Sequence, residues 1–382
     1  MKKILMPMVE AGSGHKMPAL AVKEALDRLY PGSYEVRVID FAKECGALES
    51  DKAIKGAWDI GLAHPLLARL GYRLADTFWP LSLKWPSVAY PDFLSHAVEY
   101  IRQYGPDLIF STNYITATVS AHVKKRLGLQ IPVMSFVTDP FDAFGWWVDP
   151  ALDMICVASV VAQDQLLARG IPALRTSVFQ FPIHSKFLAA SADPEALRNT
   201  LGLRPDVPTI LTSEGGQGIG TISSYVLKLH ELDFPCNIVS VCGRNDALRE
   251  ELLRAAASRP SATNLVPLGF VDNMHELLEL SDLCVAKAGA STTFEALLKG
   301  VPIIFASWAT YNEKPNIDYC VDRGIGWFAP DFGSFKTTLD GLLVGDTLKH
   351  AKQRIAALAL HSGSDDIARF LHECVETGGI PA

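Results

Sequence analysis

Short, continuous runs of apolar residues alternate with segments of helical spacing along the chain. In the first half these runs lie at 3–8, 108–112, 133–137 and 154–158, and a half-polar run lies at 34–40. In the second half they lie at 209–213, 236–242, 264–268, 283–286 and 302–305. Apolar strands that alternate with helices form parallel sheets covered on both faces. The sequence therefore predicts two doubly wound, Rossmann-like α/β domains that face each other across a cleft.

A polar stretch at 186–206, with Pro205 near its end and Pro208 just after it, separates the two halves. We predict an N-terminal domain over 1–187 and a C-terminal domain over 188–362. The remaining residues, 363–382, are expected to form a helix and tail that could return to the N-terminal domain. A chain of 382 residues is long enough for this arrangement.

Composition excludes several classes of protein. The formal net charge is −7, with −8 on 189–382 and +1 on 1–188, and it argues against nucleic-acid binding. No apolar run is long enough for a transmembrane helix. The first ten residues read as a buried strand rather than a signal peptide. The seven cysteines are scattered and favour core thiols in a reducing compartment, so we expect a cytoplasmic protein without a metal knuckle.

One segment, 58–90, breaks the alternation of strands and helices. It combines three tryptophans, other aromatic residues and the cations Arg69, Arg73 and Lys84. We expect a helical insertion of which most residues pack on the first domain. The alternative is contact with a membrane interface, because aromatic and cationic residues on an amphipathic segment suit that position.

The stretch 287–297 reads as the end of a strand, a turn of small residues and the start of a helix. Gly289 allows a ligand to approach the backbone, and Ala290 follows it. Ser291, Thr292 and Thr293 could cap a helix whose N-terminus suits a phosphate. Glu295 lies one turn later and could reach a ribose hydroxyl. The alternative is an ordinary capped helix after a strand.

Two glycine-rich turns follow predicted strands. The first spans 10–15 and includes Gly14 and His15, and the second spans 213–220 and includes Gly216, Gln217 and Gly218. Such turns can approach a diphosphate, although neither has the full spacing of a known nucleotide-binding motif. A histidine at the mouth of a parallel sheet can accept a proton from an attacking hydroxyl. Its alternative role is that of a helix-start residue.

Other candidate residues also follow strands. Asp139 could orient His15 or contact an acceptor, or it could simply stabilise a turn before proline. Trp146 and Trp147 could form an apolar rim or belong to the core. Arg244 could bind a phosphate or a base, and Phe270 and Val271 could present their backbone to a uracil. The polar stretch 311–316 could bind sugar hydroxyls, with turn formation as the alternative.

These motifs, in this order, resemble a family of glycosyltransferases. It includes monogalactosyldiacylglycerol synthase, processive diacylglycerol glucosyltransferases and, more distantly, the lipid-II-forming N-acetylglucosaminyltransferase. The matching segments are AGSGH (11–15), TDPF (138–141), FPIHSKF (181–187), GGQGIG (215–220), CGRN (242–245), GFVDNM (269–274), KAGASTTFEAL (287–297), GVPIIF (300–305) and NEKPN (312–316). The chain differs from this family pattern at two places that bear on the acceptor. Ala290-Ser291 replaces the Pro-Gly of the lipid galactosyltransferases, and Phe144-Gly145-Trp146 replaces a His-Pro before tryptophan.

The resemblance implies the two-domain GT-B fold, with an N-terminal acceptor-binding domain and a C-terminal UDP-sugar-binding domain. It implies transfer of a hexose from a UDP-sugar to a lipid or other hydrophobic hydroxyl, with inversion and without a metal or cofactor. Its site residues match those proposed above: His15 as base; Gly216, Gly218 and Ser291 at the diphosphate; Glu295 at the ribose; Phe270 and Val271 at the base; Glu313 and Asn316 at the sugar. A peripheral position on the inner face of the membrane would follow.

Two other functions remain open from the sequence. A UDP-N-acetylglucosamine 2-epimerase shares the architecture and would process the donor without an acceptor. A non-catalytic nucleotide-sugar-binding protein would bind UDP without turnover. A dehydrogenase is disfavoured, because the dinucleotide fingerprint is incomplete.

Overall fold

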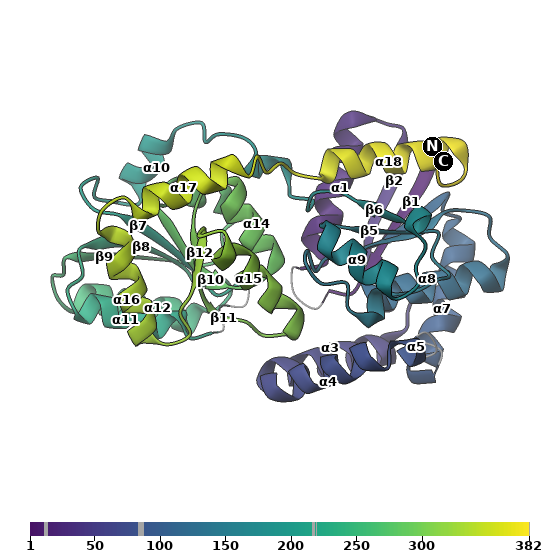
Figure 1. Cartoon of the computed structure of the whole chain (residues 1–382), viewed down its shortest axis with the longest axis horizontal. Helices are drawn as coiled ribbons and strands as arrows, with labels where there is room; N and C mark the ends of the chain where they lie inside the picture. The colour runs from purple at the N-terminus through teal and green to yellow at the C-terminus, as the bar shows by residue number, and fades with distance from the viewer. Residues whose placement is uncertain (11–13, 83–87, 216–217, 219, 382) are drawn as a thin grey trace. The chain divides into compact units, whose positions relative to one another are not determined.

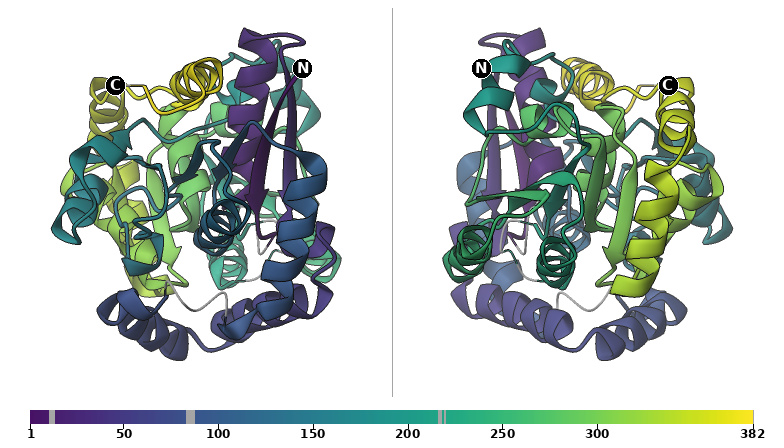
Figure 2. Two further views of the ribbon diagram at one scale, coloured as in Figure 1. Left: turned by 90° about the vertical axis from the view of Figure 1, so that its right-hand side faces the viewer. Right: turned by 90° about the vertical axis from the view of Figure 1, so that its left-hand side faces the viewer.

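The computed structural model describes residues 1–10, 14–82, 88–215, 218 and 220–381. The chain forms two compact units. The first comprises Met1–Ser185, Thr310–Asn312 and Ser362–Ala382, and the second comprises Lys186–Ala309 and Glu313–His361. Each unit is built around its own parallel sheet with helices on both faces (Figures 1 and 2).

The sheet of the first unit has the strand order β2-β1-β3-β4-β5-β6. Its strands are β1 (Lys2–Met8), β2 (Tyr34–Asp40), β3 (Leu108–Ser111), β4 (Val133–Phe136), β5 (Met154–Val157) and β6 (Thr176–Val178). The helices are α1 (Lys16–Leu29), α2 (Phe41–Glu44), α3 (Leu48–Ala63), α4 (Pro65–Thr77), α5 (Trp79–Ser82), α7 (Pro91–Tyr104), α8 (Tyr114–Leu127), α9 (Val160–Ala168) and α18 (Ser364–Thr377), with short 3-10 turns η1 (Gly145–Trp147), η2 (Ala173–Arg175) and η3 (Ser185–Phe187).

The sheet of the second unit has the strand order β12-β11-β10-β7-β8-β9. Its strands are β7 (Thr209–Ser213), β8 (Cys236–Val241), β9 (Thr263–Leu268), β10 (Leu283–Lys287), β11 (Ile303–Ser307) and β12 (Gly326–Phe328). The helices are α10 (Pro194–Thr200), α11 (Ile222–Glu231), α12 (Asp246–Ser258), α13 (Met274–Glu279), α14 (Ala290–Leu298), α15 (Lys314–Asp322), α16 (Phe332–Leu343) and α17 (Thr347–Ala357), with the 3-10 turn η4 (Tyr311–Glu313).

The prediction of two doubly wound α/β domains is confirmed by these two sheets. The strands are buried because apolar residues fill both of their faces, as in β7, β8 and β10. In each sheet the strand order reverses once, between β1 and β3 in the first unit and between β7 and β10 in the second. Open α/β sheets bind ligands at the carboxyl ends of such strands, where the following loops diverge.

The predicted polar linker at 186–206 is only partly irregular. Residues Pro194–Thr200 form helix α10, which sequence reading did not anticipate. The Asp193 carboxylate accepts a hydrogen bond from the amide of Ala196, 2.9 Å away, and Pro194 occupies the first helical turn. An N-cap aspartate followed by proline is a helix-start signal, so this helix could have been recognised.

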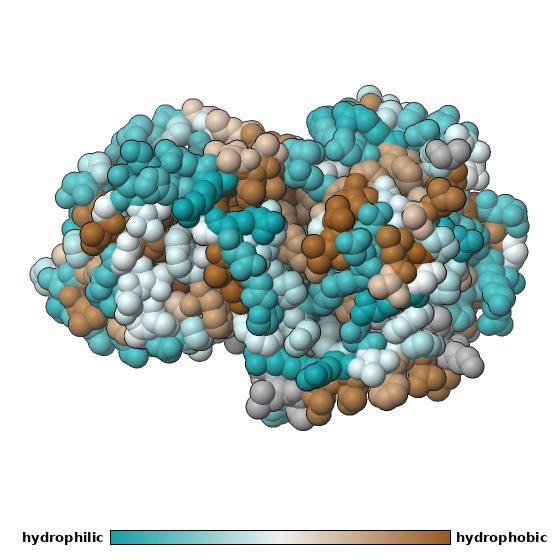
Figure 3. Space-filling model, in the orientation of Figure 1, coloured by the Kyte–Doolittle hydropathy of each residue, from teal (hydrophilic) through white to brown (hydrophobic). Residues whose placement is uncertain are grey.

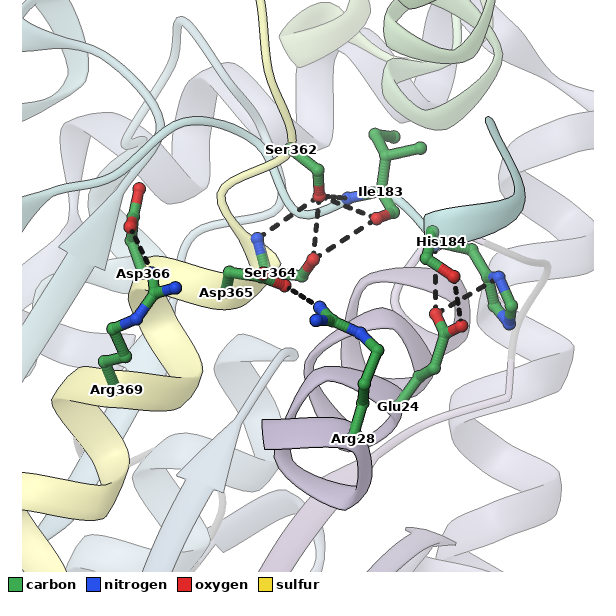
Figure 4. A network of polar contacts seen from close by, with 10 residues as sticks. Glu24, Arg28, Ile183, His184, Ser362, Ser364, Asp365, Asp366 and Arg369 are labelled. Atoms are coloured by element: carbon green, nitrogen blue, oxygen red, sulfur yellow. Dashed lines mark hydrogen bonds and ion pairs between the residues drawn. The ribbon is translucent and has the colours of Figure 1, made fainter. Parts of the chain in front are cut away.

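Residues 362–382 lie in the first unit, where α18 packs against α1. Ser362 and Ser364 bind the backbone of Ile183, and the Ser362 hydroxyl donates to the Ile183 carbonyl over 2.6 Å (Figure 4). Glu24 on α1 accepts hydrogen bonds from the amide and hydroxyl of Ser185 and lies 3.2 Å from Nδ1 of His184. Arg28, one turn further along α1, pairs with Asp365. The segments just before the crossing at 185/186 and just after the crossing at 361/362 are therefore bonded within the first unit.

The segment 58–90 is helical through α3, α4 and α5, and its residues 83–87 lie outside the described part. Tyr72, Asp76 and Trp79 face the body of the first unit. The ring of Tyr72 packs on Phe144, and Asp76 accepts from the amide of Gly145 over 2.7 Å. Trp79 lies against Gly145. A Cβ atom on residue 145 would lie only 2.2 Å from the Cβ of Trp79, so only glycine fits there. In the described ranges, no helix is both long enough and apolar enough to cross a membrane.

Candidate active site

His15 lies at the point where the strand order of the first sheet reverses. It follows the loop after β1 and is the N-cap residue of α1, while Thr112 follows β3. The Thr112 hydroxyl donates to the His15 carbonyl over 2.7 Å, which ties the two diverging loops together. Gly14 is exposed beside it, and residues 11–13 of the predicted glycine-rich turn lie outside the described part.

The imidazole of His15 is held through Nδ1. This atom lies 2.7 Å from the Thr112 carbonyl and 2.9 Å from the Thr138 hydroxyl. A carbonyl only accepts hydrogen bonds, so Nδ1 carries the proton and Nε2 keeps its lone pair. Burial lowers the pKa of His15 to about 4, although the hydrogen bond to Thr112 opposes that shift. The ring is therefore neutral near pH 7, with Nε2 able to accept a proton.

Asp139 follows β4 in the same unit. Its carboxylate accepts a hydrogen bond from the indole N–H of Trp147 over 2.9 Å. Trp147 is buried, and its ring centroid lies 6.3 Å from that of His15. Asp139 therefore positions Trp147, whose ring lies near His15. The His15 Nδ1 atom itself contacts Thr112 and Thr138. Trp147 belongs to the core, and Trp146 is partly buried against it.

The second unit has its own strand-order reversal, with the loops after β7 and β10 on either side. Glu214, directly after β7, is buried and accepts hydrogen bonds from the amides of Ile222 and Ser223. These are the first free amides of α11, so a carboxylate already satisfies the N-terminus of that helix. The predicted anion cradle of the glycine-rich turn stays a prediction, because Gly216 and Gln217 lie outside the described residues.

The glycines of this turn serve its geometry. Gly218 has a positive φ of 63°, and a Cβ there would lie 2.0 Å from the Cys242 carbonyl. Its amide donates to the Gly215 carbonyl over 3.0 Å, and its carbonyl accepts from Asn245 over 2.8 Å. Gly218 is therefore required for a close approach to the next loop, and its amide is already used. Gly216 and Gln217 lie outside the described residues.

Helix α14 begins differently from α11. Its N-cap is Gly289, and in the part of the chain that is described no side chain caps it. The predicted capping by Ser291, Thr292 and Thr293 is wrong, because these residues lie inside the first helical turns and Thr293 donates to the Gly289 carbonyl over 2.8 Å. The amides of Ala290, Ser291 and Thr292 precede the first intrahelical hydrogen bond. Among the described residues, no atom lies within 4 Å of the place that a Cβ on Gly289 would take.

Two buried polar atoms near this helix start lack hydrogen-bond partners among the described residues, and a carboxyl nearby has a shifted pKa. The Ser291 hydroxyl is buried without one. Asn316 on α15 donates to the Ala288 carbonyl over 2.8 Å, but its amide oxygen is buried and unpaired. Glu295 is partly buried, and burial raises the pKa of its carboxyl to about 7 while the charge of Lys186 opposes the rise. Buried polar groups are normally satisfied, so these groups indicate a ligand site.

The other candidate residues lie on loops and turns that follow strands of the second unit. Phe270 is 63% exposed, and the guanidinium of Arg244 lies 5.3 Å from its ring centroid. Val271 is partly buried beside it. Glu313 accepts a hydrogen bond from the amide of Ala309 over 2.6 Å, which shapes the turn after β11. An exposed aromatic ring covered by a cation offers a flat surface for a planar ring.

Three residues that contact or act on the candidate groups of the two units were not predicted from the sequence to do so. Thr112 fixes the tautomer of His15 from 97 residues away, and no local pattern announces that contact. Glu214 was counted as part of a glycine-rich turn, although a carboxylate eight residues before a helix start could have suggested a cap. Lys186 lies in the stretch assigned to the linker, yet its charge reaches Glu295.

Comparison with known proteins yields two family matches. Residues 15–183 match the family model for monogalactosyldiacylglycerol (MGDG) synthase, and residues 213–316 match the glycosyltransferase family 28 C-terminal domain. A protein of Oryza sativa subsp. indica, named probable monogalactosyldiacylglycerol synthase 2, chloroplastic, is 27% identical over 339 residues. That alignment covers 86% of this chain and 71% of the rice protein.

Solved structures share the fold. The crystal structure of Acinetobacter baumannii MurG has a TM-score of 0.63 at 16% identity, covering 98% of this chain and 100% of that one. The UDP-GlcNAc 2-epimerase from Neisseria meningitidis, bound to UDP-GlcNAc, has a TM-score of 0.59 at 12% identity, with coverage of 98% and 100%. At these identities the likeness shows the fold alone, which is the predicted GT-B class.

The family matches include most of the motif residues, and they agree with the resemblance drawn from those motifs. The chain is therefore a glycosyltransferase, whose residues 15–183 match the MGDG synthase family and whose residues 213–316 match the family 28 C-terminal domain.

Proposed function

We propose that this glycosyltransferase moves a hexose from a UDP-sugar to a hydroxyl group of a lipid such as diacylglycerol, with inversion and without a metal. The start of α14 carries the proposal. In the described structure its first three amides are not capped by a side chain. The Ser291 hydroxyl and the Asn316 amide oxygen are buried nearby without hydrogen-bond partners, and Asn316 is tied to this turn through the Ala288 carbonyl. An uncapped helix N-terminus is suited to a diphosphate.

The parts of a UDP-sugar fit the groups of the second unit. The diphosphate would bind the amides of Ala290, Ser291 and Thr292 and the Ser291 hydroxyl. An ionised Glu295 would accept hydrogen bonds from the ribose hydroxyls. The base would lie against Phe270, Arg244 and Val271, and Asn316 with Glu313 would contact the sugar. These amides and the helix dipole would stabilise the charge that develops on the leaving UDP, which is the task a metal performs in other transferases.

The first unit would supply the base. The acceptor hydroxyl attacks C1 of the sugar from the face opposite UDP, and its proton passes to Nε2 of His15 as the bond to the phosphate oxygen breaks. The products are the glycosylated lipid with inverted configuration, UDP and a protonated His15, which then releases its proton to water. The Thr112 carbonyl would stabilise the imidazolium through Nδ1. Asp139 would be a positioning residue through Trp147.

A lipid acceptor is supported by the name of the rice relative and by the outer face of α4. Leu70, Leu74, Phe78 and Leu81 recur at helical spacing along α4 and α5, and each is more than half exposed. Tyr72, Asp76 and Trp79 hold the opposite face to the body of the unit. Figure 3 shows hydrophobic side chains along the lower edge of the view, where Figure 1 places α3 and α4.

We propose that this outer face of α4 and α5 lies in a membrane interface. Exposed apolar residues on one face of an amphipathic helix, with the exposed cation Arg73 beside them, suit that position. The seven cysteines are free thiols, which suits a reducing compartment and thus the inner, cytoplasmic side of the membrane.

The reaction is tested by measuring UDP release from the purified protein with UDP-glucose, UDP-galactose or UDP-N-acetylglucosamine, each with and without diacylglycerol vesicles. We expect release that requires one of these donors and the vesicles, with the glycolipid formed in equal amount. Vesicle-independent formation of a 2-epimer would favour the epimerase. Binding of UDP without turnover on any lipid or soluble hydroxyl acceptor would contradict the proposal and favour a binding protein.

We expect His15→Ala to lower kcat by roughly 10²–10⁴-fold with little change in the affinity for the UDP-sugar, because the ring acts only as the base. The lowered pKa of His15 means that its base form is present above pH 4 and is lost below it. At saturating substrates, kcat of the wild type should therefore stay level from pH 8 to about 5 and fall towards pH 4. The control is His350→Ala, at an exposed histidine of α17. A kcat of His15→Ala close to that of the wild type would refute the base assignment.

We expect Leu74→Glu and Phe78→Glu to lower binding to vesicles, because each removes an apolar side chain from the interface. Burial of such a side chain contributes about 1.5–3 kcal/mol, so the partition coefficient should fall by about tenfold or more per substitution. Vesicle sedimentation measures the effect. The control is Leu174→Glu, because Leu174 is 89% exposed on η2, away from α4 in sequence. Equal losses for Leu174→Glu and Leu74→Glu would argue against a specific membrane face.

A further inference from the structure

The hydroxyl of Thr138 lies against the imidazole that we assign as the base. Its Oγ1 atom is 2.9 Å from Nδ1 of His15, and Thr138 is buried, with 4% of its surface exposed. The Thr112 carbonyl oxygen lies 2.7 Å from the same nitrogen. The three residues follow β1, β3 and β4, which are neighbours in the first sheet. The carboxyl ends of three adjacent parallel strands thus bring one imidazole and two oxygen atoms together.

The backbone is fixed on both sides of Thr138. The Val137 amide donates to the Cys156 carbonyl over 2.8 Å, which continues the pairing of β4 with β5. On the other side, the Ser159 hydroxyl donates to the Pro140 carbonyl over 2.6 Å. A β-branched side chain such as that of threonine is also restricted at χ1. The Thr138 oxygen therefore has a defined position beside the imidazole.

The direction of the hydrogen bond between Thr138 and His15 follows from the other neighbour of Nδ1. A carbonyl oxygen can only accept, so Nδ1 carries a proton that both oxygens can accept. If Thr138 donated to Nδ1 instead, the lone pair of that nitrogen would face the Thr112 carbonyl oxygen at 2.7 Å. Two electron-rich atoms repel each other at such a distance. The Thr138 hydroxyl is therefore a second acceptor on the Nδ1–H group of His15.

We propose that Thr138 is a positioning residue of the transfer reaction, whose oxygen holds the His15 ring at Nδ1 and stabilises the imidazolium as Nε2 takes the acceptor proton. The inference rests on the proposed function, because it takes His15 to be the base. In that step the acceptor oxygen bonds to C1 of the sugar, its proton moves to Nε2, and the bond from C1 to UDP breaks. Hydrogen bonds from a cationic ring to oxygen are charge-assisted and stronger than those from the neutral ring. The second acceptor therefore contributes more in the transition state than in the ground state.

The buried position of His15 makes such a contribution necessary. Burial lowers the pKa of His15 to about 4, so the imidazolium is unfavourable there unless oxygen dipoles face it. In the described part of the chain, the two oxygens that contact Nδ1 belong to a carbonyl and a hydroxyl. The hydroxyl is the one of the two that a substitution can remove.

The test compares kcat and KM of Thr138→Val with those of the wild type, with UDP-glucose or UDP-galactose and diacylglycerol vesicles. Valine keeps the branched shape of threonine but has no oxygen. We expect kcat to fall roughly 10- to 100-fold while KM for donor and lipid changes by less than about twofold, because the lost hydrogen bond strengthens only as the charge forms. Thr138→Ser keeps the oxygen and should restore most of kcat. The matched control is Thr176→Val, which removes a buried hydroxyl at the start of β6, at the opposite edge of the sheet, and should leave kcat unchanged.

A double-mutant cycle with His15→Ala separates positioning from a structural role. A residue that acts through the imidazole has no effect once the imidazole is gone. The residual kcat of His15→Ala combined with Thr138→Val should therefore equal that of His15→Ala alone. A further loss of about tenfold in the double variant would show that Thr138 supports the fold or substrate binding instead, and it would refute the proposal.

The proton arrangement can be measured without turnover. Nitrogen-15 chemical shifts of labelled histidine distinguish the two neutral tautomers, and the His15 signals are assigned by their absence in His15→Ala. At pH 7 the wild type and Thr138→Val should both carry the proton on Nδ1, because the Thr112 carbonyl remains. A wild-type ring with its proton on Nε2 would make Thr138 a donor and overturn the proposal.

The outcomes distinguish this inference from the proposed function. If the wild type transfers sugar from no donor, the proposed function fails and the role of Thr138 fails with it. If the wild type is active and a folded Thr138→Val has the same kcat, the role of Thr138 is refuted while the proposed function stands. If Thr138→Val does not fold, Thr138→Ala lacks the same oxygen, and a kcat there close to that of the wild type is equally contrary.

Discussion

The first turn of α14 has three backbone amides that no side chain in the described structure caps, and the proposed donor chemistry depends on them. A helix start carries a partial positive charge that must be satisfied by a cap, by water or by a ligand. The neighbouring helix α11 shows the alternative, since Glu214 occupies its N-terminus with a buried carboxylate. The same topology thus provides two helix starts at the strand-order reversal of the second sheet, and only α14 can receive an anion without displacing a carboxylate.

Burial adjusts the acid–base groups of the two units in opposite directions, and both shifts suit the proposed roles. In His15 it disfavours the imidazolium, so the ring enters the reaction neutral and Thr112 determines which nitrogen holds the lone pair. In Glu295 it disfavours the carboxylate, which then depends on a nearby cation or on ligand hydroxyls to remain ionised. The charge of Lys186 opposes that rise in the pKa of Glu295.

The fold could be predicted from the sequence because buried parallel strands are continuous apolar runs, and β7 has the bounds that its pattern predicted. Local signals that were overlooked account for α10, where Asp193 and Pro194 mark a helix start. The site was predicted less completely. Ser291 and Thr292 were read as caps because hydroxyl residues prefer that position, yet Gly289 takes it and leaves their amides free. The partners of His15 and Glu295 are distant in sequence, and single-sequence patterns contain no information about such contacts.

Amide hydrogen exchange with and without saturating UDP tests the donor site most directly. We expect UDP to slow exchange at Ala290, Ser291 and Thr292, whose amides would bind the diphosphate. We expect no change at Ile222 and Ser223, whose amides Glu214 already holds. Slowed exchange at Ile222 and Ser223, with none at the start of α14, would place the diphosphate at the other helix and contradict the central claim.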